Sequence, residues 1–436
     1  MFMSAVQPNV SLVGIAVQYP PSKEGPEFVE ALVHRHYDLT PAVEKTLEIN
    51  RKSRIDNRYS VLDPEHDYWH QSKVPTISDC DALFKQYGIP LAVQACTKAI
   101  EDWGGLSSDI THVVAVTCTN TSNPGFDGLV CQQLGLQDST RRVLLHGVGC
   151  GGGLAAIRVA QEMLLGATQQ GKPGRVLIIS CELPTLFTRT ELDSMNQNQR
   201  PNVAIGLFGD CAAAMVLSNG VEVKQEERAP IWDIMNCQTT HLRGSEGLGE
   251  YNVGPNGYVA KIDKKIPLFI GQSIQGGFTS LISSTPGLAS EPKNYNPENY
   301  DWAFHPGGYA FLIAAQNVLG LSSYRLRKSF EAYHDGGNTV SSTVISILNR
   351  LNKERENNLA GVGIEEQKGG RLTSDKGADK VIAVAFGHGL TMEMTMFTKP
   401  ELPNAYSPSL KWISLSALSL VSVGSLAYTF ASGKKI

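Results

Sequence analysis

Runs of valine, isoleucine, leucine and alanine recur along the chain, and several of them lack the alternation with polar residues that marks a half-exposed strand. Such runs are typical of strands that are covered on both faces, as in α/β proteins. We expect strands at Ser11–Val17, His112–Thr117, Arg142–His146, Arg175–Ser180, Ala212–Leu217, Trp302–Phe304 and Lys380–Phe386. Helical spacing of apolar residues lies between them, at Ile89–Trp103, Gly153–Gly166, Tyr309–Leu319 and Ser341–Asn352. The alternation of strand and helix predicts a layered α/β architecture with crossover connections.

Two segments share one outline, in which a strand runs into a turn of small residues and then a helix. One turn carries Cys150 and the other carries His305. The likeness indicates an internal duplication, although the two segments do not match at a fixed period. We place the boundary between the halves near Asn219–Val221. The stretch Gly361–Lys380 is rich in glycine and charged residues and predicts an exposed loop.

Charge and cysteine usage narrow the class of protein. The formal net charge of the 436 residues is −4, which gives no global attraction for nucleic acid. The 8 cysteines form no CxxC pair and no cluster with histidine, so no structural metal site is expected. The start of the chain has neither a basic flank nor a long apolar stretch, so we expect no secretory signal, a cytoplasmic location and free thiols.

The C-terminal residues differ in composition from the rest of the chain. Ile413–Ala431, about 19 residues, contains no charged side chain and is followed by Lys434 and Lys435. This length is close to the roughly 20 residues that a membrane-spanning helix needs. We expect a C-terminal tail anchor; a helix packed on the body of the protein, or a disordered tail, is the alternative.

Cys150 has the setting of a nucleophile. It lies between the apolar segment that ends at His146 and a helical pattern that begins with three glycines. The free N–H groups and positive end of a helix dipole stabilise a thiolate and lower its pKa. Glycines beside the sulfur leave room for a substrate carbonyl. A buried structural cysteine beside a glycine-rich turn is the alternative.

His305 and Asn338 follow the same pattern. His305 stands at the end of the apolar segment Trp302–Phe304, where ligand sites form in α/β proteins. Asn338 stands just before another helical pattern. An imidazole can accept a thiol proton, and an asparagine N–H can stabilise an oxyanion. Each residue alone is more often structural, but together with Cys150 they predict a catalytic site.

In order along the chain, these motifs resemble the type III polyketide synthases of the chalcone synthase-like superfamily, and especially their fungal alkylpyrone- and alkylresorcinol-forming branch. The resemblance covers about residues 10–398 and rests on the Cys150 turn together with Thr117–Asp127, Leu207–Ala214, Trp302–Gly308, Gly337–Asn338 and Phe386–Thr391. It implies a thiolase-like fold of two duplicated halves in five αβαβα layers, residues 1–220 and 221–400, with residues 401–436 as an extension. It also implies a homodimer, and CoA thioesters as substrates with no further cofactor and no metal.

Residue roles follow from the same resemblance. Cys150 matches the acyl-carrying nucleophile, and His305 and Asn338 match the pair that promotes malonyl decarboxylation. Phe208 and Tyr258 match aromatic gate residues, Asn120 is a cavity residue of the matched segment Thr117–Asp127, and Lys45 and Lys52 match CoA-binding positions. Pro184 and Phe187 stand at cavity positions where plant members have threonines. Other positions also depart from the family pattern: Glu48 stands where a third basic residue is expected, Asn123 stands where plant members carry a methionine that reaches across the dimer, and His388 replaces a proline.

The predicted reaction is the condensation of a fatty acyl-CoA starter with malonyl-CoA, followed by cyclisation to an alkylpyrone or alkylresorcinol. A ketoacyl synthase of the fatty-acid-initiating type also uses Cys, His and Asn, but it resembles His-Gln-Ala-Asn where this chain has His305-Pro-Gly-Gly. A cysteine hydrolase, or a non-catalytic protein that binds lipid or serves as a membrane scaffold, is also compatible with parts of the pattern. Starter length and the number of extensions depend on cavity volume and cannot be read from sequence.

Overall fold

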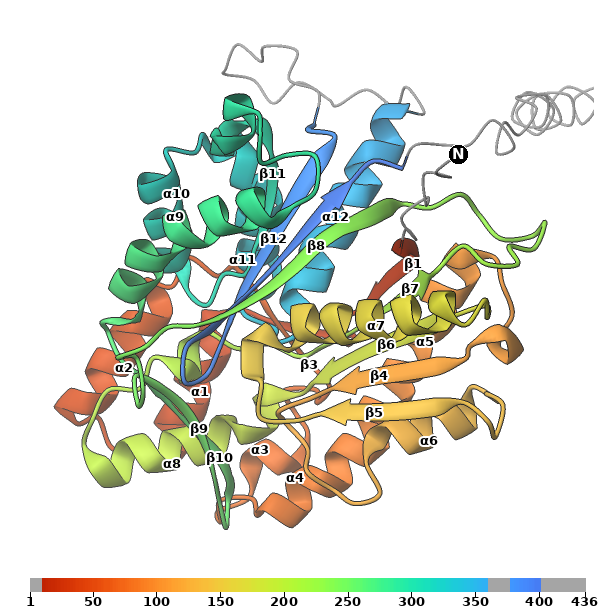
Figure 1. Cartoon of the computed structure of the whole chain (residues 1–436). Helices are drawn as coiled ribbons and strands as arrows, with labels where there is room; N and C mark the ends of the chain where they lie inside the picture. The colour runs from red at the N-terminus through yellow and green to blue at the C-terminus, as the bar shows by residue number, and fades with distance from the viewer. Residues whose placement is uncertain (1–9, 360–376, 401–436) are drawn as a thin grey trace, which may run out of the picture. The chain divides into compact units, whose positions relative to one another are not determined.

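A computed structural model describes residues 10–359 and 377–400. Its centre is one nine-stranded sheet in the order β11-β12-β13-β8-β1-β7-β6-β4-β5 (Figure 1). The strands are β1 (Val10–Gln18), β4 (His112–Val116), β5 (Arg141–Leu145), β6 (Arg175–Glu182), β7 (Cys211–Ser218), β8 (Trp232–His241), β11 (Asp301–Phe304), β12 (Lys380–Gly387) and β13 (Thr391–Thr398). Two short pairs stand apart from it, β2 (Ser22–Glu24) with β3 (Arg58–Ser60), and β9 (Gly249–Gly254) with β10 (Gly257–Ile262).

The two halves of the sheet repeat one pairing scheme. In the first half β4 pairs parallel with β6, while β6 with β7 and β7 with β1 are antiparallel. In the second half β11 pairs parallel with β12, while β12 with β13 and β13 with β8 are antiparallel. The halves join where β1 meets β8 over Val10–Leu12. The boundary that we predict near Asn219–Val221 falls between β7 and β8.

Helices cover both faces of each half and give the five predicted layers (Figure 1). α7 (Gly152–Gln169) and α12 (Ser342–Leu359) pack on each other and on strands of both halves, so they form the central layer. α5 (Ile89–Trp103) and α6 (Phe126–Gln133) cover the outer face of the first half, and α9 (Ile266–Ser284) and α10 (Tyr309–Leu319) cover the second. The remaining helices are α1 (Pro26–His36), α2 (Pro41–Arg51), α3 (Asp67–His70), α4 (Ile77–Leu83), α8 (Thr188–Asn198) and α11 (Arg327–Gly336).

Local sequence explains why these elements form. All eight residues of β6 are buried, which is the expected result for an apolar run covered on both faces. α5 places its apolar residues at helical spacing on β1 and β7. It ends at Gly104, whose φ of 84° is the left-handed conformation that glycine adopts without strain, and whose N–H donates to Ile100 O at 3.0 Å.

The repeat changes which turns correspond. β4 leads into α6, an outer helix that packs on α5, and β11 leads into α10, an outer helix that packs on α9. The turn of His305 is therefore the counterpart of the turn after β4. The central helices α7 and α12 correspond to each other, so the counterpart of the Cys150 turn is the turn of Asn338. The sequence comparison of the Cys150 turn with the His305 turn was wrong, because the first turn leads into a helix of the central layer and the second into a helix of an outer layer.

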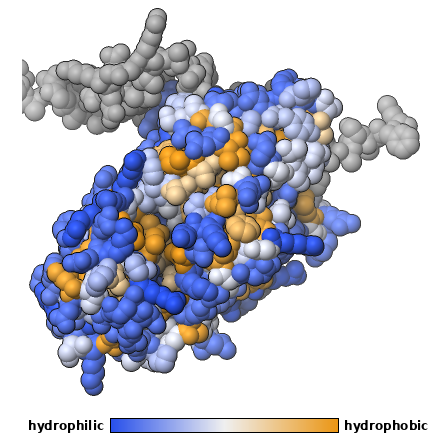
Figure 2. Space-filling model, turned by 90° about the vertical axis from the view of Figure 1, so that its left-hand side faces the viewer, coloured by the Kyte–Doolittle hydropathy of each residue, from blue (hydrophilic) through white to orange (hydrophobic). Residues whose placement is uncertain are grey.

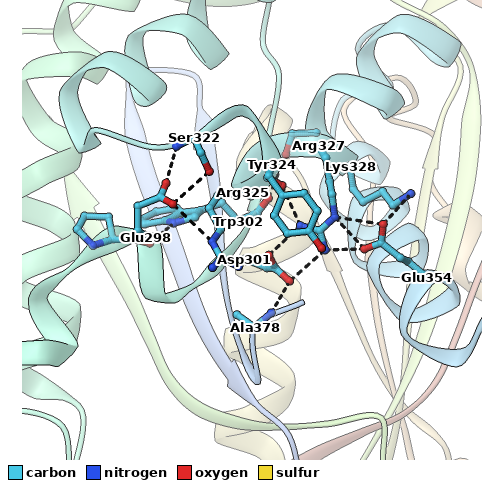
Figure 3. A network of polar contacts seen from close by, with 12 residues as sticks. Glu298, Asp301, Trp302, Ser322, Tyr324, Arg325, Arg327, Lys328, Glu354 and Ala378 are labelled. Carbon is cyan, nitrogen blue, oxygen red and sulfur yellow. Dashed lines mark hydrogen bonds and ion pairs between the residues drawn. The ribbon is translucent and has the colours of Figure 1, made fainter. Parts of the chain in front are cut away.

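A network of charges holds the amino end of β11, the strand that carries His305 at its other end (Figure 3). Asp301 accepts from Arg327 Nη1 at 2.8 Å and Arg325 Nη1 at 3.3 Å, and also from Ala378 N at 3.0 Å. Arg327 Nε also donates to Glu354 Oε2 of α12 at 2.9 Å. The network links β11 to α11, to α12 and to the residues just before β12. It therefore holds these elements of the second half in place relative to one another.

Within residues 10–359 and 377–400, no helix is long and apolar enough to cross a membrane. The anchor expected at Ile413–Ala431 lies outside the described residues, as does most of the loop expected at Gly361–Lys380. Lys380 itself already belongs to β12.

Candidate active site

Cys150 lies in a single 3₁₀ turn, Gly149–Gly151, directly before α7. The predicted place at a helix N-terminus is therefore confirmed. The adjoining glycines, however, serve close packing. A β-carbon at Gly149, which has a φ of 60°, would lie 2.5 Å from His388 Nδ1, and one at Gly153 would lie 2.5 Å from Ser341 O. These glycines let the turn fit between α12 and the loop after β12.

Asn338 lies against Cys150. Its Nδ2 is 3.9 Å from Cys150 Sγ, and its Oδ1 is 4.0 Å from the same sulfur. Val340 N donates to Asn338 Oδ1 at 2.8 Å, so the amide oxygen is held by the backbone and the amide N–H groups face Cys150 Sγ. Val340 has a φ of 54°, which is rare for a β-branched residue and costs about 1–3 kcal/mol. Strain of this kind persists where the surrounding structure holds a functional turn in place.

His305 is fully buried at the carboxyl end of β11, where its backbone N–H donates to Val384 O of β12 at 2.8 Å. The strand beside His305, β12, ends at Gly387. A β-carbon added at Gly151 would lie only 3.1 Å from Gly387 N, so the end of this strand lies against the Cys150 turn. Neither ring nitrogen of His305 has a hydrogen-bond partner within the described part of the chain. Buried polar groups are rarely left unpaired, and this imidazole is free to bind a substrate atom.

Electrostatics correct one expectation about Cys150. Burial raises the pKa of its thiol to about 12, while the hydrogen bond with Asn338 acts in the opposite direction. Burial also lowers the pKa of His305 to about 3, with a further contribution from His388. The helix N-terminus therefore does not give a lowered thiol pKa in this state, because the loss of water around the sulfur outweighs it. Both groups are neutral at pH 7.

Phe208 is held beside Asn338 by the backbone. Gly209 N donates to Asn338 O at 3.1 Å and Asn338 N donates to Leu207 O at 2.9 Å, which form an isolated parallel bridge. The Phe208 ring is half-buried and packs against the small cluster of Cys118, Cys150 and Val340. The Phe208 ring therefore lies beside the Cys150 turn.

Tyr258 and Phe187 belong to an aromatic group that also contains Tyr251 and His388. Tyr251 stacks on Tyr258 at 4.9 Å between ring centroids, and Phe187 meets Tyr258 edge-on at 5.1 Å. Tyr251 also stacks on His388 and packs on the cluster with Cys150. The β9–β10 pair that carries both tyrosines thus closes one side of the site. Pro184 is buried and begins the short helical turn that ends at Phe187.

Sequence reasoning missed Tyr251 and Glu182. Glu182 is fully buried at the end of β6 and accepts from Cys118 N at 3.0 Å and Thr119 Oγ1 at 3.0 Å. It also accepts from Ser341 Oγ, three residues beyond Asn338. Burial raises the pKa of this carboxyl, and its charge raises the pKa of Cys150. A glutamate at the end of a buried strand whose centre, Val176–Ile179, is apolar was the signal in the sequence, since a buried carboxylate must be hydrogen-bonded.

Asn120 does not face the aromatic group with its amide. Its Nδ2 donates to Asp81 Oδ1 at 2.8 Å and its Oδ1 accepts from Ser122 N at 3.0 Å. These bonds hold the loop after β4 in place. Both ends of the Asn120 amide are therefore engaged in hydrogen bonds within this part of the chain.

Lys45 and Lys52 are among the residues that line a pocket of ≈ 350 Å³. The pocket also contains Leu207, which precedes Phe208, and Gly307, which lies two residues after His305. Both lysines bind Glu48, each at 2.7 Å, and they lower the pKa of that exposed carboxyl to about 2. The departure noted at Glu48 thus neutralises part of the basic patch.

Comparison with known proteins agrees with this geometry. The family models for the N-terminal and C-terminal domains of chalcone and stilbene synthases match residues 29–220 and 233–399. Acylalkylpyrone synthase csyB of Aspergillus oryzae is 54% identical over 392 residues, 90% of this chain and 95% of that protein. Type III polyketide synthase pspB of Penicillium soppii is 34% identical over 408 residues, 91% of this chain and 97% of that protein. A crystal structure of CsyB complexed with CoA-SH superposes with a TM-score of 0.85 at 54% identity, covering 90% of this chain and 100% of that one.

Proposed function

The chain belongs to the chalcone and stilbene synthase family of type III polyketide synthases, and on that premise we propose that it extends a fatty acyl-CoA starter with malonyl units on Cys150 and closes the product as an alkylpyrone. The observation that carries the site assignment is the contact of Cys150 Sγ with the Asn338 amide at 3.9 Å. The name of the 54% identical relative favours the pyrone over the resorcinol. Family membership decides against the ketoacyl synthase hypothesis.

Loading begins from neutral groups. With the thiol pKa near 12 and the imidazole pKa near 3, Cys150 keeps its proton until a thioester is bound. His305 accepts that proton as the sulfur attacks the acyl-CoA carbonyl, and the proton leaves on the CoA thiol. The acyl group is then a thioester of Cys150, and no net proton has been gained or lost.

Extension uses the same pair in a second way. Malonyl-CoA loses carbon dioxide, and the negative charge moves to its thioester oxygen as an enolate. A neutral imidazole has one N–H, and Asn338 Nδ2 offers two more, so both can donate to that oxygen. The enolate carbon attacks the Cys150 thioester and the sulfur leaves, which gives a β-ketoacyl-CoA. Each further round first returns the β-ketoacyl group to Cys150, and CoA-SH leaves. After the last round an enol oxygen attacks the thioester carbonyl, the lactone closes, and the thiol leaves with the enol proton.

The experiment is a product analysis. Purified protein is incubated with malonyl-CoA and acyl-CoAs of graded chain length, and the products are identified by mass. We expect triketide or tetraketide pyrones from the wild type and none from Cys150→Ala, while Cys237→Ala, a cysteine outside the site, keeps its activity. Chain growth by the Cys150→Ala protein would refute the assignment. Release of free fatty acid without growth would instead indicate a hydrolase.

A homodimer is the second part of the proposal. β5 ends the described sheet, so one of its edges has no pairing strand, and its residues Val143–Leu145 are only half-buried. Open edges of this kind are commonly covered by another strand. We propose that a second copy covers β5, and sedimentation equilibrium of the full chain should give twice the mass of 47.2 kDa. A monomer at micromolar concentration would contradict this.

The tail anchor at Ile413–Ala431 remains a proposal from sequence alone. The uncharged stretch of about 19 residues and the two lysines after it support the proposal. After a carbonate wash, which removes peripherally bound proteins, the full chain should stay in the membrane fraction of a cell lysate and a chain ending at Pro408 should not. If its distribution equals that of the full chain, the segment is not an anchor.

A further inference from the structure

Two outer helices of the second half form an uncharged surface. α9 and α10 pack on each other, and neither contains a single Asp, Glu, Lys or Arg over Ile266–Ser284 and Tyr309–Leu319. Leu268 is 60% exposed and Val318 is 43% exposed, although both are large apolar side chains. A β-carbon at Gly271, one turn from Leu268, would lie 3.4 Å from Val318 Cγ2, so the two side chains belong to one surface.

We call this surface the α9–α10 face and define it by Pro267, Leu268, Ala310, Phe311 and Val318. Figure 2 views the side of the molecule on which these helices lie in Figure 1, and it shows hydrophobic residues gathered on its upper part, at the height of α9 and α10. Apolar residues scattered singly on a surface need no explanation, but a gathered group marks an interaction site.

Basic side chains border the face. Lys264 and Lys265 directly precede α9 and are exposed, and neither takes part in an ion pair within the described part of the chain. Asp263, the acidic neighbour, accepts a hydrogen bond from Lys265 N at 2.8 Å. Arg54 is also exposed, and its guanidinium lies 4.1 Å from the centroid of the Tyr309 ring at the start of α10. The border is therefore positive and the face itself neutral.

The face shares residues with the pocket that Lys45 and Lys52 line. Pro267, Ala310 and Phe311 line the pocket of ≈ 350 Å³ that also contains Leu207 and Gly307. Leu268 and Val318 lie outside the pocket lining. The face therefore adjoins a pocket whose lining combines these apolar residues with the charged side chains of Lys45, Lys52 and Lys264.

From these observations we propose that the α9–α10 face docks on a bilayer that contains anionic phospholipid and takes up fatty acyl-CoA directly from it. The proposal rests on the proposed function, since only a long acyl chain makes the membrane the reservoir of substrate. An uncharged apolar face with a lysine border has the chemistry of an interfacial site, in which side chains enter the acyl boundary and cations meet the headgroups. It does not require the C-terminal segment.

The direct test places a probe on the face of the full chain. Leu268→Cys is labelled with an environment-sensitive fluorophore and mixed with vesicles of phosphatidylcholine containing about one third phosphatidylserine. We expect a blue shift and protection from an aqueous quencher. Leu106→Cys is the matched control, because Leu106 is 63% exposed and lies far along the chain, before β4. The labelled wild type corrects for reaction at native cysteines. If the Leu268 probe is unshifted while the protein sediments with vesicles, the contact lies elsewhere and the inference is wrong.

A second variant pair tests the role in substrate uptake. In the chain ending at Pro408, which lacks the proposed anchor and keeps all the described helices and strands, Leu268→Ser with Val318→Ser should lower the fraction bound to these vesicles by about tenfold or more, since each loses buried hydrocarbon. It should raise KM for vesicle-borne long-chain acyl-CoA and leave KM for a short, water-soluble acyl-CoA unchanged. Leu106→Ser with Val223→Ser, two other exposed apolar residues, should change neither. Vesicle binding is measured without substrate, so it still decides the inference if the protein proves to extend no acyl chain. Vesicle binding by the Leu268→Ser, Val318→Ser double variant that equals that of the unsubstituted protein would overturn the inference.

Discussion

Replacing Asn338 by aspartate separates the two proposed tasks of the site. The carboxylate can still accept the 2.8 Å hydrogen bond from Val340 N, so the turn keeps its main support. The lost group is the N–H end, whose nitrogen lies 3.9 Å from Cys150 Sγ. Removing one oxyanion donor costs about 2.7–4 kcal/mol of transition-state stabilisation, which is about 10²–10³ in rate. A carboxylate about 4 Å from an enolate adds repulsion of up to about 4 kcal/mol at an effective dielectric constant near 20.

We therefore expect Asn338→Asp to lower malonyl-CoA decarboxylation by at least 10³-fold, estimated from these two terms. Acylation of Cys150 by the starter should fall much less, because His305 still accepts the thiol proton. The first rate is measured as carbon dioxide released, and the second as the mass increase of the intact protein. Asn349→Asp is the matched control, since Asn349 is a buried asparagine of α12 outside the site. Decarboxylation within tenfold of the wild type, in a protein with unchanged circular dichroism, would refute the reasoning.

Four further predictions concern the site. The rate of Cys150 alkylation by iodoacetamide, followed by mass, should rise about tenfold per pH unit from pH 8 to 10 without levelling, because the thiol pKa is about 12. The pKa of His305 is about 3 in the folded protein and about 6.5 in the unfolded chain, so the stability that neutral His305 contributes is complete above pH 6.5 and is lost as the pH falls toward 3. His305→Leu should therefore reduce the loss of melting temperature between pH 7 and pH 5. An unchanged loss would contradict the lowered pKa of His305. Glu182→Gln should shift the alkylation profile of Cys150 to lower pH, since its charge raises that pKa, and should lower stability by about 1–3 kcal/mol in thermal melts by leaving donors unmatched. Tyr251→Ala should admit longer starters, visible as product masses, since its ring packs beside Cys150.

Much of the fold was predictable because its signals are local. The apolar run at Arg175–Ser180 and the helical spacing at Ile89–Trp103 are properties of short segments, and both correspond to β6 and α5. The pairing of Lys45 and Lys52 with Glu48 is of the same local kind, because the lysines stand three and four positions from Glu48, on α2 and at the residue that follows it. The strands β8 and β13 were not predicted, since polar residues interrupt their apolar pattern.

The surroundings of Cys150 were less predictable, for a physical reason. Tyr251 is brought to Cys150 by the docking of the β9–β10 pair, a contact across more than 100 positions of sequence. No periodicity records where such a pair docks. The same holds for burial, which depends on every neighbour of a side chain. This is why the pKa of Cys150 was expected to be low from its helix and is raised by its surroundings.

The repeat of the two halves explains how these opposing effects fit together. Cys150 precedes α7 and Asn338 precedes α12, the two corresponding helices of the central layer, and the two side chains meet at 3.9 Å. The positive N-terminal ends of both helices are therefore directed at the same small space. Burial keeps the resting thiol neutral, so these dipoles have no anion to stabilise before substrate binds. Charge develops there only when the thiol is attacking, when the enolate forms or when the sulfur leaves. The site thus disfavours a resting thiolate but is preorganised for negative charge that develops during the reaction. It therefore stabilises the transition states more than the ground state, and this difference accelerates the reaction.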